Sequence, residues 1–276
     1  MNNKLKAVTF SYDDGTTQDI RLIELLNKYN LKCTFNLNSE LLAKKGILTR
    51  RGQRIAHYKI HPEDVKGLYE GHEVSVHTLT HPRLTNLTDD EVIRQVEEDR
   101  LNLSDLVGYE VVGMAYPCGG VNHDDRTADL IRQKTGVKYS RTITCTNSFD
   151  PQEDLYQFNP TQYHLNFDEM MTLGEKFVEL NAKTPQIFYI WGHSFEINAD
   201  CMKHRRMIAV ILCDQCECLF LRDTDTGSAL TVYAEGSTSS VSPSACLSSA
   251  FFSTSGSSLP RTEALRSIPR HAFGLK

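Results

Sequence analysis

The sequence lacks any hydrophobic run long enough to cross a membrane. Its longest apolar stretch, residues 207–213, is far shorter than the roughly 18 to 20 residues that a membrane-spanning helix needs. Residues 1–6 are polar and basic and lead directly into the apolar residues 7–10, without the apolar core and small-residue cleavage site of a secretion signal. We therefore expect no membrane segment and a cytoplasmic location.

The chain also lacks an excess of positive charge and a disulfide framework. Its formal net charge is −5 over 276 residues, which argues against a nucleic-acid partner. Eight cysteines are present, and those before residue 200 (Cys33, Cys118 and Cys145) are scattered, as is typical of a reducing compartment. A hydrophobic content of 40 % and a charged content of 24 % are ordinary for a globular protein.

Residues 5–194 alternate between strand-like and helix-like patterns. Buried strands are expected over residues 5–11, 31–37, 73–76, 111–116, 137–142 and 187–191. Helices are expected over residues 17–30, 62–70, 88–107, 123–134 and 166–180, the third and fifth opened by capping-box patterns. Residues 39–60 are irregular and predict a hairpin or an excursion. This order favours an α/β fold with a parallel sheet or barrel covered by helices.

The pattern changes after about Ala199. Residues 203–206 are basic, and residues 237–258 are dominated by serine, a composition that buries too little apolar surface to offset its ordering entropy. We expect a catalytic domain over residues 1–200 and an irregular, poorly ordered tail over residues 201–276. A shifted reading frame would also produce such an ending, a hypothesis that the coding DNA would test.

Two adjacent carboxylates, Asp13 and Asp14, follow the first predicted strand and precede Gly15. Paired acids before a glycine occur in many ordinary turns. At the end of a buried strand, however, they project from a rigid support, and a cation would let both stay ionised. One would then be a metal ligand and the other a proton acceptor.

Two histidines, His77 and His81, follow the third predicted strand and stop at Pro82. On a helical turn this spacing would place both imidazoles on one side, able to grip one ion. The alternative is a surface turn with two solvated histidines. One carboxylate and two imidazoles are a usual ligand set for a catalytic zinc-type ion that keeps a position open.

Two further strand ends carry candidate residues. Tyr116, Pro117 and Cys118 precede two glycines, which predicts either a tight turn or a loop whose backbone amide meets an oxyanion. Trp191, the only tryptophan, belongs either to the core or to a stacking surface for a sugar ring. His193 follows it and is either structural or a proton donor.

Together these motifs resemble those of the polysaccharide deacetylase family, also called carbohydrate esterase family four or the NodB-homology domain. The resemblance covers roughly residues 5–196, and the order of the motifs is its specific part. It implies a distorted (β/α) barrel of about seven strands. It also implies the roles of five residues: Asp13 as general base, His193 as general acid, and Asp14, His77 and His81 as metal ligands.

The resemblance further implies an oxyanion and substrate pocket formed by Tyr116, Pro117, Cys118 and Trp191, with the N–H of Cys118 as the oxyanion donor. 

The chain departs from the family pattern at Ala115, where the family often has an arginine that orients the base. Arg141, in the region of the family's fourth motif, is a candidate to take over that role. The chain also shows no recognisable last helix and strand after His193.

We therefore expect a metal-dependent hydrolase that removes N- or O-acetyl groups from a carbohydrate. Its cofactor would be one divalent ion, and zinc fits the ligands, although cobalt, nickel, manganese and iron fit the same set. The expected partner is an acetylated sugar or another small acylated substrate, with no nucleic acid and no membrane. Two alternatives stay open: a hydrolase of small amides or cyclic imides, and a carbohydrate-binding pseudoenzyme.

Overall fold

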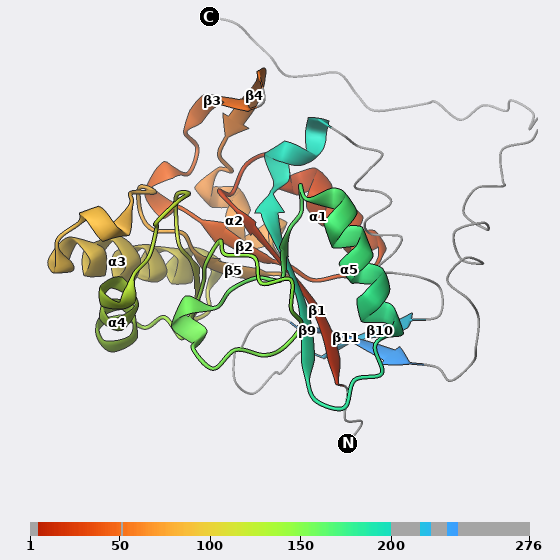
Figure 1. The fold of residues 1–276 in the computed structure, drawn as a ribbon. Helices are drawn as coiled ribbons and strands as arrows, with labels where there is room; N and C mark the ends of the chain where they lie inside the picture. Colours follow the sequence, from red (N-terminus) through yellow and green to blue (C-terminus); the bar gives the residue numbers. More distant parts are fainter. Residues whose placement is uncertain (1–4, 51, 200–215, 222–230, 237–276) are drawn as a thin grey trace, which may run out of the picture. The chain divides into compact units, whose positions relative to one another are not determined.

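The central element of the structure is a curled sheet of parallel strands (Figure 1). The computed structural model describes residues 5–50, 52–199, 216–221 and 231–236. The parallel strands are β1 (Lys6–Asp13), β2 (Thr34–Leu37), β5 (Glu73–Val76), β6 (Gly113–Ala115), β7 (Tyr139–Arg141), β8 (Gln162–Tyr163) and β9 (Gln186–His193). Within the described residues these seven follow the spatial order β8-β9-β1-β2-β5-β6-β7. The predicted α/β fold with about seven barrel strands is confirmed.

Helices follow most of these strands and cover the sheet (Figure 1). They are α1 (Asp19–Lys28), α2 (Pro62–Leu68), α3 (Asp89–Val107), α4 (Asp125–Lys134) and α5 (Phe167–Glu179). As predicted, α3 is capped by Thr88, whose hydroxyl accepts a hydrogen bond from the N–H of Glu91 at 3.4 Å. The similar start predicted for α5 is wrong in detail, because the Asn166 side chain donates to Gln162 at 2.8 Å and caps nothing. No helix in the described part combines the length and apolar character needed to cross a membrane.

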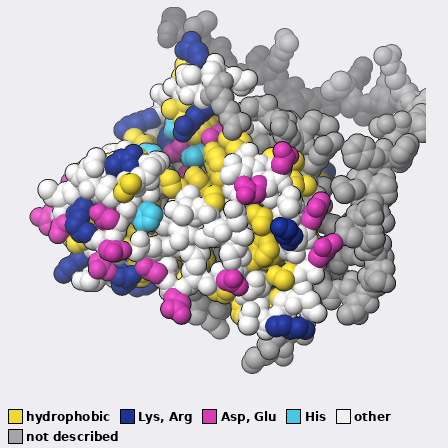
Figure 2. All heavy atoms as spheres, in the orientation of Figure 1, with side chains coloured by type: hydrophobic (Ala, Val, Ile, Leu, Met, Phe, Trp, Pro, Cys, Tyr) yellow, Lys and Arg dark blue, Asp and Glu magenta, His cyan; other side chains and the backbone are white. Residues whose placement is uncertain are grey.

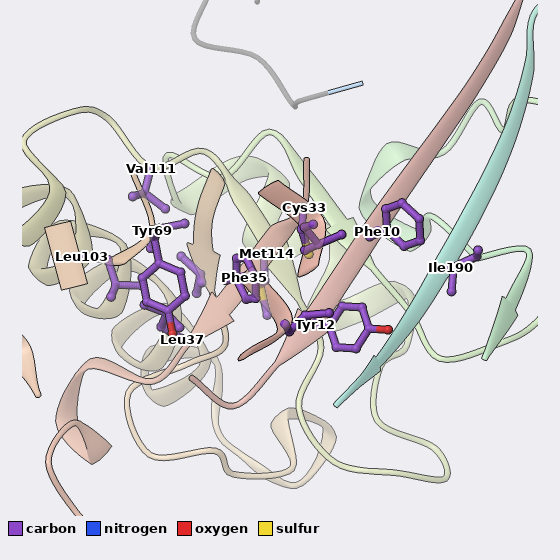
Figure 3. Close-up of a cluster of buried hydrophobic side chains, with 14 of the residues drawn as sticks. Phe10, Tyr12, Cys33, Phe35, Leu37, Tyr69, Leu103, Val111, Met114 and Ile190 are labelled. Atoms are coloured by element: carbon purple, nitrogen blue, oxygen red, sulfur yellow. The ribbon is translucent and has the colours of Figure 1, made fainter. Parts of the chain in front are cut away.

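The core lies between the sheet and these helices (Figure 3). Phe10 and Ile190 come from the paired strands β1 and β9, and Phe35 and Met114 come from β2 and β6. Each is at most 1 % exposed, and burying one such side chain stabilises the fold by roughly 1.5–3 kcal/mol. Strands buried on both faces read as continuous apolar runs, which is why β1 and β9 are visible in the sequence.

One segment, residues 158–164, joins the two edges of the seven-stranded set. The N–H of Phe158 donates to the carbonyl of Ser140 in β7 at 2.9 Å. Further along, the N–H of His164 donates to the carbonyl of Trp191 in β9 at 2.9 Å. This segment, which contains the edge strand β8, therefore also contacts β7 at the other edge of the curled sheet. The sequence does not reveal β8, since a strand of two residues carries no pattern.

Two antiparallel pairs lie outside this set. Strands β3 (Lys45–Arg50) and β4 (Gln53–Tyr58) form a separate hairpin, which agrees with the hairpin or excursion expected over residues 39–60. Strands β10 (Cys216–Leu221) and β11 (Thr231–Gly236) also pair, and β11 pairs with the first half of β1. The sequence analysis does not predict these last two strands. The rest of the predicted tail lies outside the described residues.

Candidate metal and catalytic site

The candidate site lies at the carboxyl ends of the parallel strands, where barrel enzymes place their chemistry. Asp13 ends β1 and His193 ends β9, and the two are register partners across this strand pair. Ala115 and Arg141 are register partners at the ends of β6 and β7. His77 directly follows β5. Five strand ends thus contribute to one edge of the barrel.

Three predicted ligands come together at this edge. Asp14, His77 and His81 each offer one ligand atom, and these atoms all lie within 4.8 Å of one another. Nε2 of His81 lies 3.8 Å from Oδ1 of Asp14, and the two imidazole rings are 4.9 Å apart at their centroids. A carboxylate and two imidazoles at such distances fit a catalytic divalent ion of the zinc type.

Both imidazoles are held in the form that binds metal. Nδ1 of His77 donates to the carbonyl of Ala115 at 2.8 Å, which leaves Nε2 free as a ligand. The backbone N–H of His77 donates to the carboxylate of Asp99 at 3.1 Å. Burial lowers the pKa of His77 to about 4 and also lowers the pKa of His81, so both rings are neutral near pH 7.

A loop, and not the helical turn considered from the sequence, brings the two histidines together. Thr78 and His81 have positive φ angles of 69° and 61° and turn the chain back on itself. Asp14 and Cys118 are also left-handed, with φ angles of 85° and 68°. Such conformations cost roughly 1–3 kcal/mol each and persist only where the surrounding structure enforces them. The fold itself therefore sets the shape of the ligand loops.

Two basic residues that the sequence analysis missed contact Asp14. Nζ of Lys59 donates to the Asp14 carbonyl at 2.5 Å and approaches Oδ1 at 3.2 Å. Nε2 of His57, in β4, lies 3.1 Å from Oδ2. Burial alone would raise the pKa of Asp14, but the charge of Lys59 and the hydrogen bond from His57 hold it well below its usual range. Asp14 is therefore ionised.

Asp13 has a different partner, Arg141. The Arg141 guanidinium donates to Oδ1 and Oδ2 of Asp13 at 2.5 and 2.6 Å, and Asn36 donates to Oδ1 at 2.8 Å. Burial alone would raise the pKa of Asp13, but the nearby charge of Arg141 keeps it below its ordinary value. Arg141 is the register partner of Ala115, so it reaches Asp13 from the strand next to β6.

Trp191 packs against the Arg141 side of this pair. The Arg141 guanidinium lies 4.7 Å from the centroid of the Trp191 ring, and the Tyr163 ring packs at 4.6 Å on the same indole. The indole is only 9 % exposed. Of the two interpretations of Trp191, these contacts match the core position, and sugar stacking stays a prediction.

His193 is oriented by Glu196, another residue that the sequence analysis missed. Nδ1 of His193 lies 3.0 Å from Oε2 of Glu196, which also accepts from the Tyr163 hydroxyl at 2.5 Å and lies 3.0 Å from Nε2 of His164. Burial alone would lower the pKa of His193, but the hydrogen bond and the charge of Glu196 raise it. An acid three positions after the histidine is a signal that the sequence offered.

The loop after β6 forms a wall beside His81. Tyr116 and Pro117 are buried, and the Tyr116 hydroxyl donates to the carbonyl of Tyr156 at 2.9 Å. The Cys118 thiol donates to the carbonyl of His81 at 3.5 Å, and burial raises its pKa, which disfavours the thiolate form. Within the described residues no hydrogen bond uses the N–H of Cys118.

The described residues thus place a candidate ion site, a buried carboxylate and a carboxylate-paired histidine at the carboxyl ends of the parallel strands of an α/β fold. The chain belongs to the polysaccharide deacetylase family, whose sequence profile matches residues 1–140.

Several known proteins are similar to parts of this chain. The chain is 28 % identical over 120 residues to the peptidoglycan-N-acetylglucosamine deacetylase PgdA of Listeria monocytogenes, a match that covers 42 % of this chain and 22 % of that protein. It is 30 % identical over 125 residues to chitin deacetylase 1 of Cryptococcus neoformans, covering 45 % and 23 %. The chain thus spans less than a quarter of these relatives. A family 4 carbohydrate esterase from Streptomyces lividans matches in structure with a TM-score of 0.46 and 14 % identity, over 75 % of this chain and 88 % of that one.

Proposed function

We propose that this chain is a metal-dependent deacetylase that releases acetate from an acetylated carbohydrate. The observation that carries the proposal is the convergence of Asp14, His77 and His81 within 4.8 Å, beside the Asp13–Arg141 pair. The names of the relatives support the substrate class, since those proteins deacetylate peptidoglycan or chitin.

The three ligands would hold one divalent ion. When bound, that ion would supply Lewis acidity, which lowers the pKa of a water molecule and polarises the acetyl carbonyl. Zinc fits two neutral imidazoles and one carboxylate, and cobalt, nickel, manganese and iron accept the same set.

Asp13 would act as the general base. Arg141 keeps its carboxylate ionised, so it is ready to take a proton at neutral pH. As water adds to the acetyl carbon, one water proton passes to Asp13, and the carbonyl oxygen becomes an oxyanion. The N–H of Cys118 would donate to this oxyanion.

His193 would act as the general acid. Glu196 holds Nδ1, which leaves Nε2 to deliver a proton to the departing nitrogen. The carbon–nitrogen bond then breaks, and acetate and a free amine leave without a covalent intermediate. The same groups would serve an O-acetyl ester, with an alcohol as the leaving group.

Acetate release from a panel of compounds tests the proposal. Purified protein with measured metal content would be incubated with acetylated chito-oligosaccharides, an O-acetylated sugar, and small amides and cyclic imides. We expect acetate from the acetylated sugars and nearly none from an Asp13→Asn variant that still binds the metal. Hydrolysis of the amides or imides alone would instead favour the second enzyme class.

The pseudoenzyme alternative rested on the missing arginine at Ala115 and on the irregular ending of the chain. The contact of Arg141 with the proposed base, from the neighbouring strand, argues against the first of these grounds. Stoichiometric metal without hydrolysis of any compound in the panel would restore that alternative. A cytoplasmic location and a small substrate stay predictions.

A further inference from the structure

The β3–β4 hairpin reaches the candidate site through one of its two faces. The register pairs Gly46 with His57, Leu48 with Ile55, and Arg50 with Gln53, so these six residues share a face. His57, on this face, lies 3.1 Å from the carboxylate of Asp14. This inward face therefore begins beside the metal ligands.

Exposure separates the two faces over most of the hairpin. On the inward face Gly46, Leu48, Ile55 and His57 are half-buried, and Arg50 and Gln53 at the tip are exposed. All the described residues of the opposite face are exposed: Lys45, Ile47, Thr49, Arg54, Ala56 and Tyr58. Arg50 thus lies at the far end of the inward face, and Arg54 lies on the outward face.

The hairpin region is strongly basic in a chain of net negative charge. Residues 44–60 contain no aspartate or glutamate. Their cations are Lys44, Lys45, Arg50, Arg51, Arg54 and Lys59. Figure 2 shows lysine and arginine side chains on this region and histidine and acidic side chains at its foot.

The exposed cations of the hairpin differ from five of the other arginines. Among the described residues, no acid lies within ion-pair distance of Lys44, Arg50 or Arg54. Five arginines elsewhere do pair with acids: Arg94, Arg100, Arg126, Arg132 and Arg141. The positive charge of Arg50, on the inward face, is therefore available to bind an anionic group of a ligand.

The positive charge of Arg50 also affects Tyr163, a neighbour of Glu196 and of the proposed acid His193. Burial and Glu196 raise the pKa of Tyr163, and the positive charge of Arg50 opposes that rise. The Tyr163 hydroxyl donates to Glu196, the partner of His193. The positive charge of Arg50 thus acts on a residue that contacts Glu196.

The spacing along the hairpin sets the length of the ligand. Arg50 lies four positions after Gly46, the register partner of His57, which corresponds to about 14 Å of strand. The half-buried apolar pair Leu48 and Ile55 lies between these ends. A ligand that lies along this face from His57 to the backbone of Arg50 would be longer than a single sugar.

We propose that the inward face of the β3–β4 hairpin binds an anionic group on the substrate, so that the enzyme acts on an acetylated oligosaccharide with a carboxylate or a phosphate several sugars from the scissile acetyl group. The inference rests on the proposed deacetylase function. Arg50 would bind the anion by charge-assisted hydrogen bonds, and the Leu48–Ile55 pair would contact the apolar face of an intervening sugar.

The test compares three acetylated oligosaccharides of equal length: one neutral, one with a distal carboxylate and one with a distal phosphate. For the wild type at low salt we expect kcat/KM for a charged substrate to exceed that for the neutral one by about tenfold, through KM, and to fall toward it as salt rises. Arg50→Gln should bring the ratio to about one. The matched variant Arg54→Gln should keep the wild-type ratio.

The carboxylate and phosphate arms identify which anion the hairpin prefers. Equal kcat/KM for neutral and charged substrates in the wild type, or the same loss of preference in both variants, would overturn the inference. If no substrate releases acetate, the proposed function fails, and calorimetric binding of the same compounds to wild type and to both variants decides the inference separately. Thermal melting of each variant checks that it is folded.

Discussion

Arg141 donates hydrogen bonds to both carboxylate oxygens of Asp13, although the two residues lie 128 positions apart in the sequence. The pair is buried, and Trp191 packs on the guanidinium. Removing one partner of a buried pair leaves an unpaired charge, which is costly for stability and for the ionisation of the other group.

Arg141→Met should therefore disable the proposed base. Without the guanidinium, burial raises the pKa of Asp13, and the acidic limb of the kcat/KM profile moves to higher pH, because Asp13 must be deprotonated to act. We expect a loss of about a hundredfold at pH 7 with metal content unchanged. Arg141→Lys keeps the charge and should lose less. An unchanged acidic limb in Arg141→Met would show that Asp13 does not take the proton.

Glu196→Gln should affect the alkaline limb of the pH profile of kcat/KM. Glu196 raises the pKa of His193, and a general acid must be protonated, so activity falls as pH rises through that pKa. The substitution should move the alkaline limb to lower pH and reduce kcat/KM at pH 7 by roughly tenfold. The acidic limb should stay in place. A pH–rate profile measured with one acetylated substrate distinguishes this shift from a uniform loss.

Removal of a ligand should abolish metal binding and metal-linked stability together. A bound ion at a thousandfold excess over its dissociation constant stabilises the folded state by about 4 kcal/mol. His77→Ala should lose the ion, lose acetate release and melt at the same temperature with or without zinc. His61→Ala, which changes an exposed histidine, should behave like the wild type. Full activity of metal-free His77→Ala would refute the ligand set.

Gly192→Ala should destabilise the acid side of the site. A Cβ at Gly192 would meet the ring of His164, with Nε2 only 2.6 Å away, and His164 contacts Glu196. Overpacking of this kind costs typically 1–3 kcal/mol in the free energy of unfolding. Gly67→Ala is the matched control, because nothing lies within 4 Å of its Cβ in α2, and it should be neutral or stabilising by up to about 1 kcal/mol. Denaturant unfolding of both variants measures the difference.

The sequence predicted those site residues that directly follow apolar strands. Asp13, His77 and His193 are of this kind, since parallel strands deliver their carboxyl ends to one edge. Sequence reasoning also proposed Arg141 as the orienting group, but its contact with Asp13 depends on the β6–β7 register, which no local pattern reveals. The motifs could therefore be recognised in the sequence, but the residues that their side chains contact could not.

The partners of Asp14 show the same limit. His57 and Lys59 reach it only because the base of the hairpin pairs with the loop after β1, where Lys59 forms a bridge with Thr16. That pairing is a long-range contact between an irregular segment and a turn. Nothing in the spacing of either segment fixes it.

The segment that links the two sheet edges has a mechanical consequence. Residues 158–164 hydrogen-bond to β7, which carries Arg141, and to β9, which carries His193. One segment therefore contacts both the strand of Arg141, which pairs with the proposed base, and the strand of His193, the proposed acid. Lengthening the chain between residues 142 and 158 should therefore displace both groups at once, whereas the proposed metal ligands follow β1 and β5 and should be displaced less.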